Sequence, residues 1–247
     1  MQQVLSSWTH LTKEDLNWLD TPSSLQPTLE RVKIVKNLGM DVAIDFHGRI
    51  HRPMAEQLAA ELELLRPMFI EEPLLSEHPA EIARLALQTA IPIALGERLY
   101  TRWDFRPMLE SGAVDIVQPE VAHCGGISEL RRIAAMAETY DVAVAPHSPL
   151  GPIAHAACLQ IGTCTPNHVI QEMSLNIHYN VGGYDLLTYV KNKDYFEVED
   201  GGWVDIPKGA GLGLEIDEDM VRKISTEKRD AWRSVIWRGE NGEFREW

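Results

Sequence analysis

Six short apolar runs in this 247-residue chain each end in an ionisable residue. Three of these residues, Asp45, Glu71 and Glu97, end successive runs and are all carboxylates. Carboxylates brought together without a cation repel one another, so that at least one must stay protonated. Hard oxygen ligands with no cysteine beside them favour Mg²⁺. The pattern therefore predicts a Mg²⁺ site held by Asp45, Glu71 and Glu97.

Two histidines accompany these carboxylates. His47 lies two residues beyond Asp45, so the period of two along an extended chain places both side chains on the same side. His147 ends the fifth run, while Glu120 and Glu172 end the fourth and the sixth. A single charge of this kind could be a loop residue facing solvent, but six at matching positions favour a common site. A substrate on the metal would then lie between two imidazoles.

The spacing of the run ends indicates the elements that position them. Successive end residues lie 23 to 27 positions apart, which is the length of a strand, a helix and two short loops. Continuous apolar runs are typical of strands buried on both faces of a parallel sheet. Between or before them lie helical patterns, at Pro27–Asn37, Pro53–Leu65, Pro79–Ala90 and Ser128–Tyr140.

Strands that alternate with helices predict an α/β fold with a parallel sheet. We expect an incomplete TIM-type (β/α) barrel of about six βα units, whose ligands sit beyond the carboxyl ends of the strands. These units fill residues 1–172. Residues 173–247 contain no clear βα unit, apart from a short final helix that Asp217 could cap. We expect this C-terminal extension to pack on the barrel as part of the same domain.

Composition limits the partners. The formal net charge is −14, with no block of Lys or Arg, which argues against nucleic acid and anionic membranes as partners. No apolar run approaches the ~18 residues of a membrane helix, and the start lacks the pattern of a signal peptide. The three cysteines form no CxxC pair and are typical of buried reduced thiols. We expect a cytoplasmic protein.

Four segments together resemble the enolase superfamily, and more narrowly its mandelate racemase subgroup with the D-galactonate dehydratases. They read Asp-Phe-His-Gly-Arg-Ile-His from Asp45, Phe-Ile-Glu-Glu-Pro from Phe69, Ala-Leu-Gly-Glu-Arg-Leu-Tyr from Ala94, and Ala-Pro-His-Ser-Pro-Leu-Gly-Pro from Ala145. Shorter matches follow at Ile177–Asn180 and Lys191–Asp194. The resemblance extends from about Trp8 to Trp247.

This resemblance implies a role for each matching residue. Asp45, Glu71 and Glu97 correspond to the Mg²⁺ ligands. His147 corresponds to the general base that removes the proton α to the substrate carboxylate, a step that the metal assists. His47 corresponds to the general acid that protonates the departing β-hydroxyl. The substrate would be a small anionic sugar acid such as D-galactonate, and the product a 2-keto-3-deoxy acid.

Two further carboxylates take supporting roles in the same resemblance. Glu172 corresponds to a residue that hydrogen-bonds the enediolate oxygen, which requires a protonated carboxyl. Glu120 corresponds to the residue that pairs with the base and raises its basicity. The family has Asp at this position, whereas this chain reads Gln118-Pro119-Glu120. The additional methylene displaces the carboxylate by about a bond length, and ~1 Å misplacements can cost about a hundredfold in rate.

Other interpretations remain open. A racemase would draw a second base from a Lys pair on the second barrel strand, and no strand-like run before Asp45 supplies one. A catalytically impaired fragment is the second alternative, because neither the capping domain of the family nor its first two barrel strands are visible. We then expect the strand ending at Asp45 and the last strand to be open edges that favour self-association. We expect Arg98 only to support its loop. Six further histidines are expected to be packed or exposed, without a ligand role: His51, His78, His123, His155, His168 and His178.

Overall fold

The computed structural model describes residues 3–5, 25–174 and 187–227, with the backbone alone for residues 3–5. Within them, six strands form one parallel sheet in sequence order. The strands are β1 (Gln3–Leu5), β2 (Val42–Asp45), β3 (Ile70–Glu71), β4 (Ile93–Leu95), β5 (Ile116–Val117) and β6 (Ala143–Val144). The described pairing runs from β1 to β6 and includes no ladder that joins these two strands.

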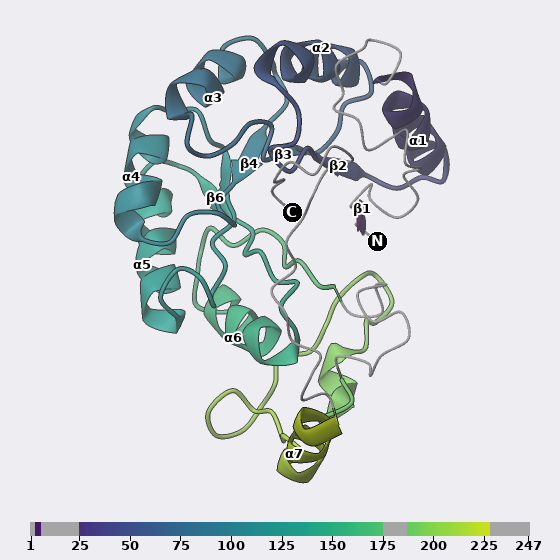
Figure 1. Cartoon of the computed structure of the whole chain (residues 1–247), viewed down its shortest axis with the longest axis vertical. Coiled ribbons are helices and arrows are strands. Elements are labelled where there is room, and N and C mark those ends of the chain that lie inside the picture. The colour runs from purple at the N-terminus through teal and green to yellow at the C-terminus, as the bar shows by residue number, and fades with distance from the viewer. Residues whose placement is uncertain (1–2, 6–24, 175–186, 228–247) are drawn as a thin grey trace.

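A helix follows each strand from β2 to β6, and α1 precedes β2. These helices are α1 (Leu25–Asn37), α2 (Arg52–Glu63), α3 (Pro79–Ala86), α4 (Arg102–Glu110), α5 (Ile127–Glu138) and α6 (Pro152–Gly162). Figure 1 shows α1 to α5 as an arc around the outside of the strands. The prediction of an α/β fold built as an incomplete barrel is therefore confirmed.

The helices lie close to the predicted positions, and residues at their ends explain where they begin and end. Pro53 and Pro79 stand in the first turns of α2 and α3. Proline has no N–H, but in the first turn this group would have no partner within the helix, so nothing is lost. Thr101 and Asp104 form a reciprocal capping box at the start of α4. Gly39 follows α1 at φ 79° and donates its N–H to the carbonyl of Lys36, so a left-handed glycine ends that helix.

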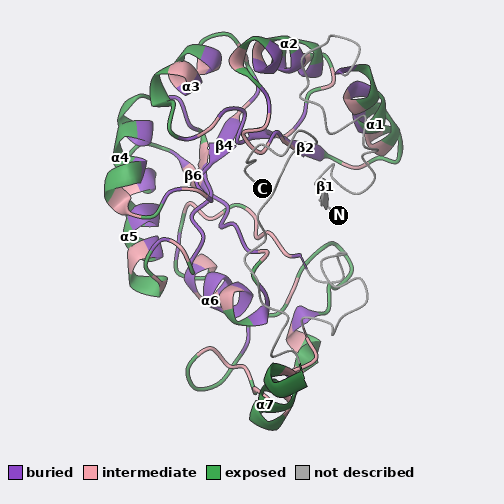
Figure 2. Ribbon diagram, in the orientation of Figure 1, coloured by how far each residue is buried: buried purple, intermediate pink, exposed green. Residues whose placement is uncertain are grey.

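The core lies between the arc of helices and the sheet. Figure 2 shows the inner faces of α2 to α5 as buried and their outer faces as exposed. Ile93, Ala94 and Leu95 are all buried along β4, as expected for a strand covered on both faces. Phe105 of α4 is completely buried. The apolar side chains thus hold the strands rigidly, and with them the residues at their carboxyl ends.

Both predicted edges differ from expectation. The strand ending at Asp45 is not an edge, because Gln3–Leu5 pairs in parallel with Val42–Ile44. Such a three-residue strand is too short to show an apolar period in the sequence. The run ending at Glu172 contributes only an isolated parallel bridge, between Val144 and His168.

The described part of the C-terminal extension contacts the barrel at α6. Val190 and Phe196 form a small apolar cluster of their own, and the ring of Phe196 lies 5.7 Å from that of His155 in α6. The Gln160 side chain donates a 2.7 Å hydrogen bond to the carbonyl of Pro207. That residues 1–172 and 173–247 form one domain stays a prediction, and Ile177–Asn180 lies outside the described residues.

The last described helix is α7 (Glu218–Glu227). Asp217 accepts a 3.0 Å hydrogen bond from the backbone N–H of Met220, which is the predicted cap. No residue of α7 is buried. None of the helices in the described ranges has the length and apolar character needed to cross a membrane.

Candidate active site

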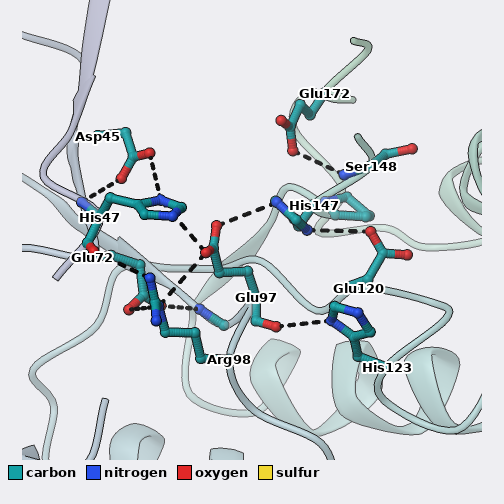
Figure 3. Close-up of polar contacts among 12 residues, drawn as sticks. Asp45, His47, Glu72, Glu97, Arg98, Glu120, His123, His147, Ser148 and Glu172 are labelled. Atoms are coloured by element: carbon teal, nitrogen blue, oxygen red, sulfur yellow. Dashed lines mark hydrogen bonds and ion pairs between the residues drawn. The ribbon is translucent and has the colours of Figure 1, made fainter. Parts of the chain in front are cut away.

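The predicted site residues converge at the carboxyl ends of the strands, and Figure 3 shows all of them except Glu71. Asp45 ends β2 and Glu71 ends β3. Glu97, Glu120 and His147 follow β4, β5 and β6 within two or three residues. Parallel strands point the same way, so residues just beyond their ends meet on one face of the sheet. The regular spacing in the sequence thus becomes proximity in space.

A continuous line of polar contacts crosses this face. The Nδ1 atom of His47 lies 3.0 Å from Asp45 Oδ2 and 3.6 Å from Glu97 Oε1. The other oxygen of Glu97 lies 3.3 Å from His147 Nε2. His147 Nδ1 in turn lies 3.2 Å from Glu120 Oε2. Glu97 therefore stands between the two imidazoles that the sequence singled out.

Negative charge accumulates around Glu71. This side chain is buried, and burial raises its pKa well above the usual range, as do the charges of Asp45, Glu172 and Glu97. Glu97 Oε1 is also buried and accepts no hydrogen bond from the part of the chain that the structure describes. Carboxylates placed in this way are destabilised unless they are protonated or share a cation. The donor types and the buried charge fit a hard divalent cation such as Mg²⁺.

The side chains of Asp45, Glu71 and Glu97 are not arranged as a coordination shell. Within the described ranges, no three side chains of His, Cys, Asp or Glu lie together as a group of metal ligands. Asp45 instead accepts hydrogen bonds from the backbone N–H of His47 at 2.6 Å and from the ring of the same residue. The assignment of Asp45, Glu71 and Glu97 as metal ligands stays a prediction.

Glu120 reaches His147 despite its additional methylene. Its side chain is completely buried, and one oxygen accepts a 3.0 Å hydrogen bond from the N–H of Ala122. The other faces the His147 ring at ion-pair distance, although the angle is not that of a hydrogen bond. Burial lowers the pKa of His147, but Glu120, Glu172 and Glu97 together raise it to about 9. The geometry suits a base paired with a carboxylate, a role that stays a prediction.

Glu172 lies near His147 (Figure 3). Its Oε2 accepts a 2.8 Å hydrogen bond from the backbone N–H of Ser148, next to His147. Burial raises the pKa of Glu172, while the positive charge of His147 and this hydrogen bond oppose the shift. A raised pKa favours the protonated carboxyl that its predicted role requires.

A second layer of residues lies beneath this face, and sequence reasoning did not single out its central member, Glu72. Glu72 is completely buried and accepts hydrogen bonds from Gly96 N–H at 3.2 Å and from Ser76 Oγ at 3.3 Å. Arg98 lies beside it (Figure 3). His123 Nδ1 lies 3.3 Å from the carbonyl oxygen of Glu97. Glu72 follows Glu71 directly, so a second charge in a buried run was a usable signal that a cationic partner lies nearby.

The remaining histidines divide by burial. His155 is buried in α6, and His168 packs against Gly162. His51 and His78 are exposed, and His178 lies outside the described residues.

Comparison with curated proteins finds relatives that are named D-galactonate dehydratase. The chain is 46% identical over 237 residues to the D-galactonate dehydratase of Variovorax paradoxus and 47% identical to that of Ralstonia pickettii. Both alignments cover 95% of this chain and 61% of the relative. The chain thus spans less than two thirds of the length of these relatives.

Solved structures and a family profile also match the chain. A putative dehydratase from Salmonella enterica matches with a TM-score of 0.76 at 28% identity, over 88% of this chain and 53% of the other. A putative mandelate racemase/muconate lactonizing enzyme from Burkholderia SAR-1 matches with a TM-score of 0.73 at 34% identity, over 82% and 49% respectively. The profile of the enolase C-terminal domain-like family covers residues 12–220. The chain therefore belongs to this family of the enolase superfamily, as the motifs at its strand ends predicted.

Proposed function

We propose that this chain carries the catalytic face of a Mg²⁺-dependent sugar-acid dehydratase that acts on D-galactonate or a similar acid. The observation that carries the proposal is the placement of Glu97 between His47 and His147, beside Glu71 and Asp45. Relatives named D-galactonate dehydratase support the substrate class. An anionic substrate in a chain of net charge −14 also requires a local positive centre, which a cation supplies.

The residues divide the reaction into two proton transfers. His147 Nε2 takes the proton α to the substrate carboxylate, and Glu120 stabilises the resulting imidazolium. His47 gives a proton to the β-hydroxyl, which leaves as water when the carbon–oxygen bond breaks. The enol that remains tautomerises to a 2-keto-3-deoxy acid.

Two further groups act on the charge of the substrate. Glu172, when protonated, donates a hydrogen bond to the oxygen on which negative charge develops. Asp45, Glu71 and Glu97 would hold Mg²⁺, which when bound offsets their mutual repulsion and stabilises the negative charge of the enediolate.

A catalytically impaired chain is the second candidate. The observation that favours it is the absence, among the described residues, of three side chains arranged as metal ligands. Among the strands that the structure describes, the order from β1 to β6 likewise contains no closing ladder. An open rim admits water, whereas a closed site excludes it. A dehydratase or racemase for another acid sugar is a further outcome of the same test.

The test combines turnover with metal binding. Formation of 2-keto acid is measured for a panel of sugar acids that includes D-galactonate, with Mg²⁺, for the chain and for His147→Asn. We expect turnover that the variant abolishes, together with a rise in melting temperature on addition of Mg²⁺ that Asp45→Asn removes. No turnover with an intact Mg²⁺ shift would identify an impaired chain. No turnover and no shift would refute the proposal.

We further propose a cytoplasmic location and association of identical chains along β6, where the run before Glu172 contributes only one isolated bridge. A strand edge that is paired over so short a length leaves N–H and C=O groups with which a second copy can pair. Light scattering tests the association, and a monodisperse monomer would contradict it.

A further inference from the structure

A partly buried arginine connects the backbone of His47 to two carboxylates. Arg98 donates a 3.2 Å hydrogen bond from Nη2 to the carbonyl oxygen of His47. Its Nε lies 3.7 Å from Glu72 Oε2 and 3.7 Å from Glu97 Oε1. The Arg98 side chain is 11% exposed and that of Glu72 is 0% exposed, so solvent screens this group weakly. Figure 3 shows Arg98 beneath His47 and Glu97.

The backbone that Arg98 holds is in an unfavourable conformation. His47 has φ 55° and Gly48 has φ 61°, so two successive residues lie in the left-handed region. Glycine adopts this region freely, but a side chain such as that of histidine does so at a cost. Glu72 across the turn also has a positive φ, of 41°, and its carbonyl accepts a 2.8 Å hydrogen bond from Gly48 N–H. Strained residues of this kind persist only where their surroundings hold them.

Glu72 is fixed independently of Arg98. Its carboxylate accepts hydrogen bonds from the backbone N–H of Gly96, just after β4, and from Ser76 Oγ. A carboxylate anchored in this way gives the guanidinium a defined place, because the planar fork of arginine can serve a carbonyl and a carboxylate at once. The contacts run from β4 through Glu72 and Arg98 to the turn that carries His47.

We propose that Arg98, anchored by Glu72, is a positioning residue that holds His47 in its left-handed conformation. In this conformation the His47 ring faces Asp45 and Glu97 at 3.0 and 3.6 Å. The effect on catalysis rests on the proposed role of His47 as the general acid. The effect on the turn itself does not depend on any activity.

The experiment uses Arg98→Met, which keeps the aliphatic stem, and Arg98→Lys, which keeps the charge but loses the fork. Arg102→Met is the matched control, because Arg102 makes a comparable paired contact with Glu129 at 2.7 and 3.0 Å, between α4 and α5. Nuclear magnetic resonance follows two signals in each variant. These are the ring nitrogens of His47, assigned with His47→Gln, and the exchange rate of the Gly48 amide.

We expect both Arg98 variants to shift the His47 ring signals and to speed Gly48 exchange by about tenfold, the size set by the left-handed penalty. Adding His47→Gly to Arg98→Met should restore slow Gly48 exchange, because glycine needs no such support. If the chain turns over a sugar acid, both variants lower kcat by about a hundredfold with KM little changed. Arg102→Met should leave all three quantities unchanged.

Two results would overturn the inference. One is unchanged His47 and Gly48 signals in both Arg98 variants. The other is a change of equal size in Arg102→Met, which would indicate general loosening of the fold. Shifted signals in a chain with no turnover would support the positioning role while refuting the proposed activity, so the two failures are distinguishable. Where Arg98→Met does not fold, Arg98→Lys decides by the same signals.

Discussion

His155 should make the stability of this protein sensitive to acid. Its ring is 2% exposed within α6, and Nδ1 lies 3.3 Å from Ser148 Oγ. Burial lowers the pKa of His155 to about 4, and a hydrogen bond with the Glu172 backbone opposes the shift only in part. The folded chain therefore keeps the ring neutral at a pH where the unfolded chain, with a pKa of about 6.5, takes up a proton.

The sign and size of the effect follow from this difference in pKa. A folded pKa below the unfolded one contributes stability that is present above about pH 6.5 and is lost as the pH falls towards 4. Each pKa unit corresponds to about 1.4 kcal/mol, so the shift from 6.5 to about 4 limits the loss to roughly 3 kcal/mol. Glu71 and Glu172 act in the opposite direction, because their pKa values are raised. Only a comparison between variants isolates the histidine.

The assay is urea unfolding between pH 7 and pH 4 for the unaltered chain and for His155→Gln, which keeps a polar side chain that takes up no proton. We expect the variant to lose about 3 kcal/mol less of its free energy of unfolding over this range. His78→Gln, at an exposed position, is the control and should follow the unaltered chain. Equal losses in the unaltered chain and in His155→Gln would refute the reasoning.

Three further predictions concern other parts of the molecule. Glu120→Gln removes a carboxylate that faces His147, so in the metal-free chain the pKa of His147 should fall from about 9. An NMR titration of the His147 ring measures this pKa, and an unchanged value would contradict the pairing. Gly96→Ala should cost about 1–3 kcal/mol in chemical unfolding, because a Cβ there would lie 2.8 Å from the backbone of Gln118 at a φ of 149°. A cost near zero would show that this loop adapts. Asp217→Ala should speed amide exchange in the first turn of α7, since the lost cap is worth about 1 kcal/mol and no residue of that helix is buried. Exchange that stays slow would show that another group holds the helix start.

The sequence predicted the repeat of strands and helices because each strand is a buried apolar run that a polar residue ends. The same period placed Asp45, Glu71 and Glu97 at neighbouring strand ends, and the structure brings them onto one face. It did not predict β1, whose three residues show no period. The sequence also predicted a full strand before Glu172, where the structure has a single bridge. An apolar run alone does not indicate whether a partner strand lies beside it.

The chemistry of the site residues was determined by the sequence itself, because their types and spacing follow from the order of the chain. Whether those residues can act on one another was decided by the tertiary structure. Glu120 reaches His147 because the path of the loop after β5, which no local pattern encodes, accommodates the additional methylene. Arg98 and Glu72 lie 26 positions apart and meet only when β3 and β4 pair. Side-chain distances of about 3 Å depend on how whole elements pack together, and a single sequence specifies that packing only through the completed fold.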